Sequence, residues 1–133
     1  MSGETNLERL LANLSPELGA DTYVFTTITH GGAMPDTTPL MQFTEEEGLT
    51  LILSRMTAES ADIPHEFPCR RITLKVHSAL DAAGLMAAVS AALAEKGISV
   101  NPVAGFFHDH LFVTEDRAEE ALGILKALSG GSA

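Results

Sequence analysis

Hydrophobic and polar residues alternate over residues 70–77, where polar side chains separate Ile72, Leu74 and Val76. Successive side chains of a β-strand point to opposite faces of its sheet, so this period of two is typical of a strand with one buried face. The alternation ends at Ser78. We therefore expect the strand to end there and the chain to turn.

A helix is predicted directly after this turn. Leu85, Val89 and Leu93 recur every four residues, which places them on one face of a helix. Asp81 is expected to cap its start, because a carboxylate accepts hydrogen bonds from the free N–H groups of a first turn. Gly97 is expected just after its last turn, in the left-handed conformation that glycine tolerates. The segment is thus interpreted as strand, tight turn and helix.

The same two periods predict the remaining elements. Thr5 and Glu8 have the spacing of a capping box at the start of a first helix, and Asp116 and Glu119 have it near the last one. The other expected elements are a helix over 7–14, strands over 23–29, 40–43, 49–53, 98–107 and 111–113, a helical turn over 58–61, and a helix over 118–128. The second half then reads βαββα, one strand short of the ferredoxin-like βαββαβ pattern. We expect the strand Tyr23–Thr29 to complete its sheet.

Composition indicates a folded chain with room for two small units. Apolar residues make up 45% of the 133 residues, which favours a packed core over disorder. Pro64 and Pro68 mark the strongest boundary, so we expect one unit over 1–66 and a second over 67–133. Each half alone would bury only about 60% of its unfolded surface. The halves are therefore expected to pack on each other or on a second subunit.

Charge and cysteine content exclude several classes of protein. The formal net charge of −10 disfavours binding to nucleic acid or to anionic membrane surfaces, which attract Lys and Arg. Cys69 is the single cysteine, so an internal disulfide is excluded. The N-terminus lacks the pattern of a signal peptide, and no apolar run reaches the roughly 18 residues of a transmembrane helix. We expect a cytoplasmic protein.

Three short motifs in the second half carry a resemblance. They are Asp-x-x-Gly at 81–84, Gly-Ile-Ser-Val at 97–100 and Val-Ala-Gly-Phe-Phe-His-Asp-His-Leu-Phe-Val at 103–113. Together they resemble the ACT domain, a small ligand-binding module of amino-acid metabolism, and especially short bacterial proteins with two ACT-like units. The resemblance implies an α+β fold of two ferredoxin-like (ACT) βαββαβ units, with antiparallel sheets and helices on one face. It makes 1–66 an N-terminal ACT-like unit and 67–133 a C-terminal ACT domain.

The turn from Ser78 to Gly84 is the candidate ligand site. A helix start presents free N–H groups and a partial positive charge, which suit a carboxylate. Gly84 would let a ligand approach the backbone, and Asp81 could accept an ammonium group. Taken alone, the spacing favours the simpler interpretation that Asp81 caps and Gly84 permits packing; the resemblance favours a ligand. The site it implies consists of Ser78, Leu80, Asp81, Ala82, Gly84, Asn101 and Val103.

Metal binding and catalysis are weaker interpretations. His108 and His110 flank Asp109, but a structural zinc site needs about four ligands, and a hydrogen-bonded turn is the favoured interpretation. Cys69 beside an apolar strand is typical of a buried small hydrophobic residue rather than a nucleophile. The sequence holds no nucleophile elbow or phosphate-binding loop. We expect no catalytic residue, no metal and no cofactor.

The resemblance therefore implies a non-catalytic regulatory protein that senses a small molecule, most simply an amino acid, at an ACT–ACT interface. Its expected partners are that ligand, a second copy in a homodimer and a separate target protein, because this chain carries no enzyme domain. Two alternatives stay open. One is a structural assembly module without a ligand, and the other is a small enzyme or metal-binding protein that uses His108, His110 or Cys69.

Overall fold

The computed structural model describes residues 3–130, and their backbone contacts divide into two compact units. The discontinuous unit combines 3–20 with 70–130, and the continuous unit consists of 21–69. The elements, in chain order, are α1 (Leu7–Ala12), β1 (Pro16–Ile28), β2 (Met41–Thr44), β3 (Leu49–Ser54), α2 (Arg55–Ser60), β4 (Glu66–Leu74), α3 (Leu85–Ala94), β5 (Asn101–Ala104), β6 (Asp109–Thr114), the 3₁₀ helix η1 (Glu115–Arg117) and α4 (Ala118–Gly130). Each unit contains one part of β1 and one part of β4.

The strands of the described residues are hydrogen bonded in the order β2-β3-β1-β4-β6-β5. Pairing is antiparallel between β1 and β3, between β2 and β3, and between β5 and β6. The predicted α+β fold with antiparallel strands and helices is therefore confirmed. None of the helices in the described part of the chain has the length and hydrophobicity that a bilayer span requires.

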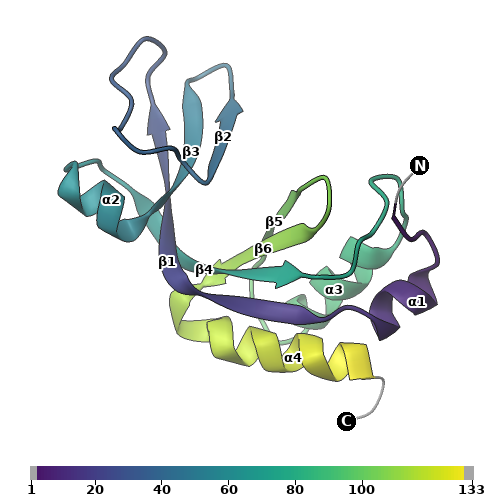
Figure 1. Cartoon of the computed structure of the whole chain (residues 1–133). Coiled ribbons are helices and arrows are strands. Elements are labelled where there is room, and N and C mark those ends of the chain that lie inside the picture. Colours follow the sequence, from purple (N-terminus) through teal and green to yellow (C-terminus); the bar gives the residue numbers. More distant parts are fainter. Residues whose placement is uncertain (1–2, 131–133) are drawn as a thin grey trace. The chain divides into compact units, whose positions relative to one another are not determined.

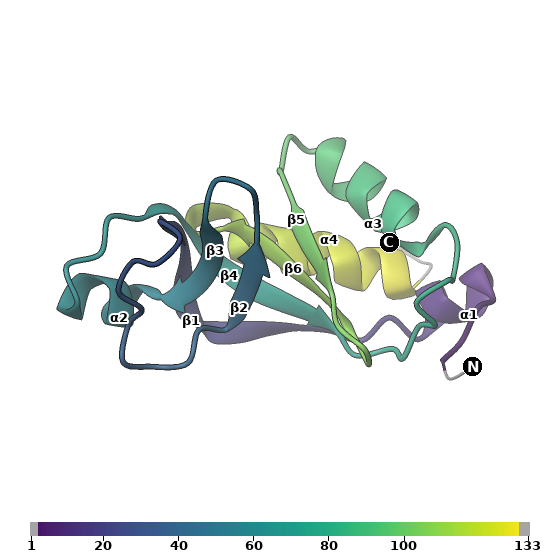
Figure 2. The same cartoon turned by 90° about the horizontal axis from the view of Figure 1, so that it is seen from above.

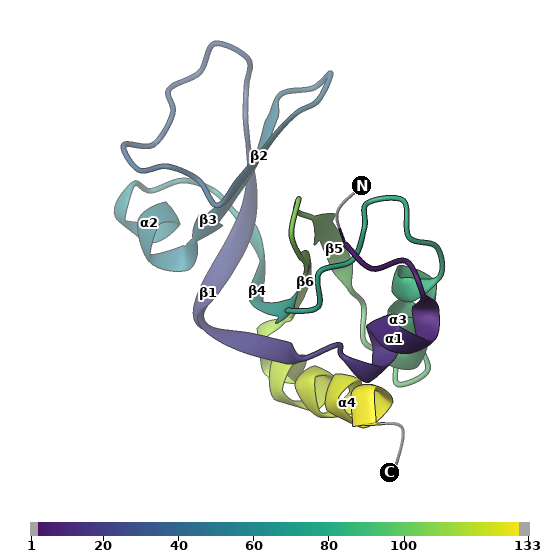
Figure 3. The ribbon, with the colours of Figure 1, turned by 45° about the vertical axis from the view of Figure 1, so that its right-hand side comes forward.

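The discontinuous unit packs three helices against one face of its strands. Helix α1 contacts both α3 and α4, and Figure 3 shows it beside them at one end of the unit. The core comes from β4, β6 and these helices, and its buried residues are Leu10, Leu14, Ile72, Leu74, Leu85, Val89, Leu93, Ile98, Leu111, Val113, Ala118, Ala121 and Leu125. The sequence predicted that one face of the strand at 72–76 and one face of the helix at 85–93 are buried, and these two faces form part of this core.

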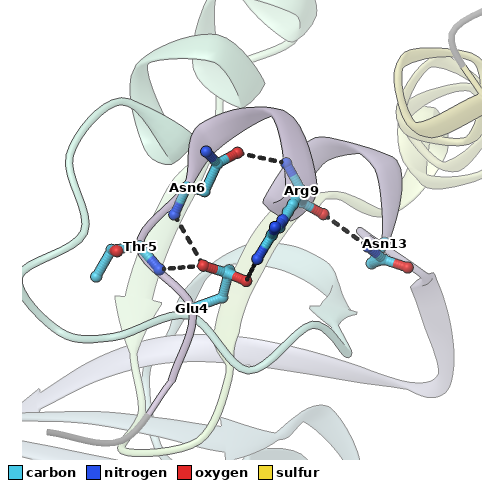
Figure 4. Close-up of polar contacts among 5 residues, drawn as sticks. All are labelled: Glu4, Thr5, Asn6, Arg9 and Asn13. Atoms are coloured by element: carbon cyan, nitrogen blue, oxygen red, sulfur yellow. Dashed lines mark hydrogen bonds and ion pairs between the residues drawn. The ribbon is translucent and has the colours of Figure 1, made fainter.

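Helix α1 begins one residue later than its expected capping box. The side chain of Asn6 accepts a hydrogen bond from the Arg9 N–H at 3.0 Å, so Asn6 is the N-cap. The Glu4 carboxylate accepts from the N–H groups of Thr5 (3.0 Å) and Asn6 (3.1 Å), and it pairs with Arg9 at 3.7 Å (Figure 4). The capping box of Thr5 and Glu8 was therefore a wrong prediction, because Asn caps as well as Thr and Glu4 already serves the preceding N–H groups.

Strand β1 starts seven residues before the predicted strand Tyr23–Thr29. Its first part, up to residue 20, belongs to the discontinuous unit, where the Arg70 guanidinium donates to the Gly19 carbonyl oxygen at 2.9 and 3.1 Å. Its second part pairs with β3 in the continuous unit. A strand from the first half does therefore join the sheet of the second half, but through Pro16–Ala20. The Leu-Gly-Ala sequence there has no strong strand pattern, which is why it was missed.

Helix α3 begins at Leu85, and its N-cap is Gly84, with a φ of +94°. The expected cap, Asp81, lies exposed in the preceding turn, and no described side chain caps the helix. The prediction failed because a left-handed Gly84 lets the chain enter the helix directly, three residues after the carboxylate. The end of the helix is as predicted, since Gly97 has a φ of +73°.

The hairpin of β5 and β6 turns earlier than expected. Gly105 donates its N–H to the His108 carbonyl oxygen at 2.9 Å, so the turn covers 105–108. Asp109 and His110 consequently belong to strand β6, and the predicted turn at 108–110 is wrong. The expected capping box at Asp116 is wrong as well, because η1 leads into α4 without a side-chain cap among the described residues. Glycine suits the first position of this turn, because a Cβ atom at residue 105 would lie 2.9 Å from the His108 carbonyl oxygen.

The continuous unit is a small sheet with one short helix. Strands β2 and β3 form the predicted hairpin, and β3 also pairs with β1. Helix α2 covers the predicted helical turn at 58–61 except for Ala61, which is its C-cap, and it starts three residues earlier. Its N-cap is Ser54, whose side chain accepts from the Thr57 N–H. Its buried core residues are Val24, Leu51, Leu53 and Ala58.

Candidate functional site

A cavity of about 250 Å³ lies within the discontinuous unit. It is bounded by the loop after β4, the start of α3 and the hairpin of β5 and β6, and Figures 1 and 2 show that loop close to the hairpin turn. Its lining residues are Ser78, Ala79, Leu80, Ala82, Leu85, Met86, Pro102, Ala104, Gly105 and Asp109. Most of this lining is apolar, and the polar groups gather at the loop and the hairpin.

Strand register decides which hairpin residues reach the cavity. Alternate residues of β5, Pro102 and Ala104, line it. Asp109 stands directly opposite Ala104, and cross-strand partners share a face of the sheet, so its carboxylate lies on the cavity side. Asn101 and Val103 consequently point to the opposite face.

The Asp109 carboxylate is the charged group of the lining. The Ser78 hydroxyl donates to its Oδ2 at 3.2 Å, which joins the loop after β4 to the start of β6. Ser78 is only 9% exposed and Asp109 is partly buried. No Lys or Arg is among the described residues that line the cavity. The cavity therefore offers a negative group with no side-chain cation beside it, which favours a positively charged ligand group.

The start of α3 supplies the opposite polarity. Leu85 and Met86 in its first turn line the cavity. The first N–H groups of a helix have no partner inside it and carry part of the positive end of the helix dipole. No described side chain caps this start. A carboxylate and an uncapped helix start thus border one cavity, an arrangement that suits a small zwitterion.

The predicted site residues separate into two groups. Ser78, Leu80 and Ala82 line the cavity. Asp81 is exposed in the turn, and Gly84, Asn101 and Val103 are absent from the described lining. Sequence reasoning missed Asp109, Met86 and Pro102. The signal for Asp109 was Gly105, a turn residue that lets the hairpin turn end early enough for the strand at 111–113 to begin at residue 109.

The N-terminal segment lies beside Gly84, which is itself exposed. A Cβ atom at Gly84 would lie 3.2 Å from Leu7 Cδ2. The backbone of Glu4 also pairs with the loop after β4, through bonds from the Glu4 N–H to the His77 carbonyl oxygen (2.8 Å) and from the Ala79 N–H to the Glu4 carbonyl oxygen (2.9 Å). The N-terminal segment thus borders the corner at 81–84 without burying it, and the cavity lies beside this corner.

The side chains of His108 and His110 lie apart from each other in the hairpin. His110 Nδ1 lies 2.9 Å from Thr73 Oγ1, and the His108 and His110 rings are 6.5 Å apart. Burial lowers the pKa of His110, and the positive charges of Arg71 and His108 lower it further. Across residues 3–130, no group of three or more His, Cys, Asp or Glu side chains is placed to hold an ion.

Cys69 is buried, and its thiol donates to the Tyr23 carbonyl oxygen at 3.4 Å. This is the environment of a packed small side chain, as expected from the sequence. A second cavity, of about 340 Å³, lies in the continuous unit and is lined by Tyr23, Thr37, Thr38, Pro39, Leu40, Leu53, Ser54 and Thr57. Its lining includes several hydroxyl groups, but no acid–base pair is among the described residues there.

Two profiles of the ACT domain match the chain, one over residues 2–70 and the other over 66–127. A protein of unknown function from Vibrio cholerae, described as a possible transport protein, is 44% identical to the chain. That alignment covers 96% of this chain and 99% of the other, with a TM-score of 0.83.

More distant structures share the fold. A protein from Agrobacterium tumefaciens is 18% identical, with 86% of this chain and 87% of that chain covered and a TM-score of 0.72. The regulatory subunit of aspartate kinase from Thermus flavus is 13% identical, with 85% and 95% covered and a TM-score of 0.61. No curated protein matches the chain.

Proposed function

Because the chain belongs to the ACT-domain family, we propose that it binds a small metabolite, an α-amino acid, without transforming it, and thereby regulates a separate protein. The two profile matches together span both halves of the chain and confirm the predicted tandem ACT organisation and ferredoxin-like fold. The boundary between residues 66 and 67 stays a prediction. The aspartate kinase regulatory subunit shows that this fold also occurs in a regulatory protein.

The observation that carries the proposal is the cavity beside Asp109. An α-amino acid carries an ammonium and a carboxylate group on one carbon atom. The cavity is bordered by a carboxylate at Asp109 and by the uncapped start of α3 at Leu85, and the rest of its lining is largely apolar. Each charge of the ligand would thus meet a group of opposite polarity.

We further propose that a second copy of the chain covers the cavity with apolar side chains in a homodimer, so that the ligand lies at an ACT–ACT interface. Leu80, which lines the cavity, is 66% exposed, and Phe106 and Phe107 in the adjacent hairpin turn are 63% and 61% exposed. Neighbouring large apolar side chains in water are typical of a surface that another protein covers. Ligand binding would then change the interface, and that change would be the signal to the target.

Titration calorimetry of the full chain with a panel of the common amino acids tests this function. At least one amino acid should release or absorb heat with a stoichiometry of one per cavity, and should raise Tm at saturating concentration, since binding to the folded state stabilises it. A complete panel without heat and without a shift in Tm contradicts the proposal. Cell fractionation tests the cytoplasmic location that we propose alongside it.

A structural assembly module is the second candidate. It is favoured by the closeness of Leu7 to Gly84, which limits the room for a ligand at the backbone of this residue. The same calorimetric panel separates the two functions, because an assembly module would form its dimer and bind none of the amino acids. An enzyme has less support: Cys69 is buried, and His108 and His110 lie outside the cavity lining in the described residues.

A further inference from the structure

The charges around the cavity restrict the ligands that it can accept. Asp109 is the sole residue with a formally charged side chain in the described lining, and the lining otherwise consists of Ser78, Gly105 and apolar residues. A second carboxylate on a ligand would lose its bound water in this cavity and would find no side-chain cation in the described lining to replace that interaction. An anionic ligand without an ammonium group would also face the repulsion of Asp109.

Asp109 is held in place from two sides. It begins strand β6 in register with Ala104, and its Oδ2 accepts from the Ser78 hydroxyl at 3.2 Å. An ionised carboxylate has about four acceptor positions. The Ser78 bond uses one of them and fixes the orientation of the group, so the carboxylate retains capacity for an ammonium donor.

The volume and lining indicate the size and polarity of the ligand side chain. A cavity of about 250 Å³ lies just below the roughly 300–1,000 Å³ of typical small-molecule pockets. It therefore suits a ligand the size of a single amino acid, such as valine, leucine or methionine. Leu85, Met86 and Pro102 supply an apolar wall for such a side chain.

From these observations, and on the premise of the amino-acid-binding function above, we propose that Asp109 binds the ammonium group of the ligand and makes the site specific for α-amino acids with aliphatic side chains. Dicarboxylic amino acids are excluded because the lining offers no partner for their second carboxylate. The 2-hydroxy and 2-keto acids of the same carbon skeleton are excluded because they bring no positive charge to Asp109.

The Asp109→Asn variant tests the role of the charge. It keeps the size of the side chain and an oxygen acceptor for Ser78, but removes the negative charge. Affinity for valine, leucine and methionine in calorimetry should fall by about tenfold or more, as expected for loss of a charged hydrogen bond. Asp116→Asn is the matched control, because Asp116 is exposed in η1 and outside the described cavity lining; its affinity should equal that of the wild type.

The wild-type protein supplies a second test that needs no variant. The 2-hydroxy acid analogue of the tightest-binding amino acid should bind about tenfold more weakly or worse, and the Asp109→Asn substitution should not weaken it further. This comparison still decides the question if the variant fails to fold.

The outcomes separate the two proposals. Equal amino-acid affinity of Asp109→Asn and wild type, or equal affinity of amino acid and hydroxy acid for the wild type, overturns the role of Asp109 and leaves the amino-acid function standing. Preference for aspartate or glutamate overturns the assigned specificity. Absence of binding by every amino acid overturns the amino-acid function itself, and this inference with it.

Discussion

Single side chains decide the chemistry of both faces of the hairpin. Because β6 begins at Asp109, the carboxylate faces the cavity, whereas His110 faces away from it and contacts Thr73. A shift of the turn by one residue would exchange these positions, since neighbouring strand residues point to opposite faces. The position of the hairpin turn therefore determines whether the Asp109 carboxylate or the His110 imidazole faces the cavity.

At this scale His110 predicts a pH dependence of stability. Its pKa in the folded chain lies below the ordinary 6.5, chiefly because burial disfavours the imidazolium, with Arg71, His108 and Lys75 acting in the same direction and Asp109 opposing them. Below about pH 6.5 the unfolded chain thus binds more protons at this residue than the folded chain does. The contribution of His110 to the unfolding free energy must therefore fall as the pH decreases through this range, until the folded imidazole is itself protonated.

The test is chemical denaturation of wild type and His110→Asn between pH 7.5 and 5. The difference in unfolding free energy, wild type minus variant, should decrease as the pH is lowered, because the variant lacks the titrating group. His30→Asn, at an exposed histidine, is the control for the loss of one imidazole. A difference that stays constant or grows towards low pH would refute the prediction.

At the scale of elements, the N-terminal segment and the loop after β4 form one paired structure. Gly3 has a φ of +95°, and a Cβ atom there would lie 2.5 Å from the Ala79 nitrogen. Glu4 pairs with residues 77–79 through two backbone hydrogen bonds. The loop that lines the cavity is therefore held from outside by chain that precedes α1.

Gly3→Ala should detach this segment and reduce the unfolding free energy by about 2–3 kcal/mol. The loss has three causes: alanine disfavours the left-handed backbone, its Cβ atom clashes with Ala79, and the hydrogen bonds of Glu4 weaken. Gly31→Ala is a matched control, since Gly31 has a φ of +82° but no atom within 4 Å of the added Cβ. Gly31→Ala should reduce the unfolding free energy by only about 1 kcal/mol, the cost of placing alanine in a left-handed backbone. Equal losses in urea denaturation of the two variants would show that the clash at Ala79 contributes nothing.

At the scale of the whole molecule, the exposed aromatic hairpin predicts self-association. Phe106 and Phe107 have ring centroids 5.0 Å apart, and Phe107 also lies 5.5 Å from His77. The two phenylalanine rings pack edge to face and remain about 60% exposed, so they form an apolar projection. Burying each ring in an interface would contribute about 1–2 kcal/mol.

The double variant Phe106→Ser, Phe107→Ser should therefore shift the dimer that we propose towards monomer in light scattering, with its Tm as a monomer unchanged. Met56→Ser is the control, because Met56 is 78% exposed in α2 of the continuous unit and its loss should leave the dimer intact. A double variant with the wild-type molar mass at all concentrations would exclude the hairpin from the interface.

Sequence alone determined the elements that depend on local periodicity. The faces of β4 and α3, the hairpin of β2 and β3, the left-handed Gly97 and the α+β class all follow from residue spacing and glycine conformation. These features need only near neighbours along the chain, so a single sequence contains their causes.

Only the tertiary structure decided the site. It set the turn at Gly105 and so placed Asp109 at the cavity, it brought residues 16–20 into the discontinuous unit, and it placed Leu7 beside Gly84. Each of these depends on contacts between residues far apart in the sequence, or on a strand register that differs by one position. The periodicity of a single segment does not distinguish such alternatives, because both satisfy the same local pattern.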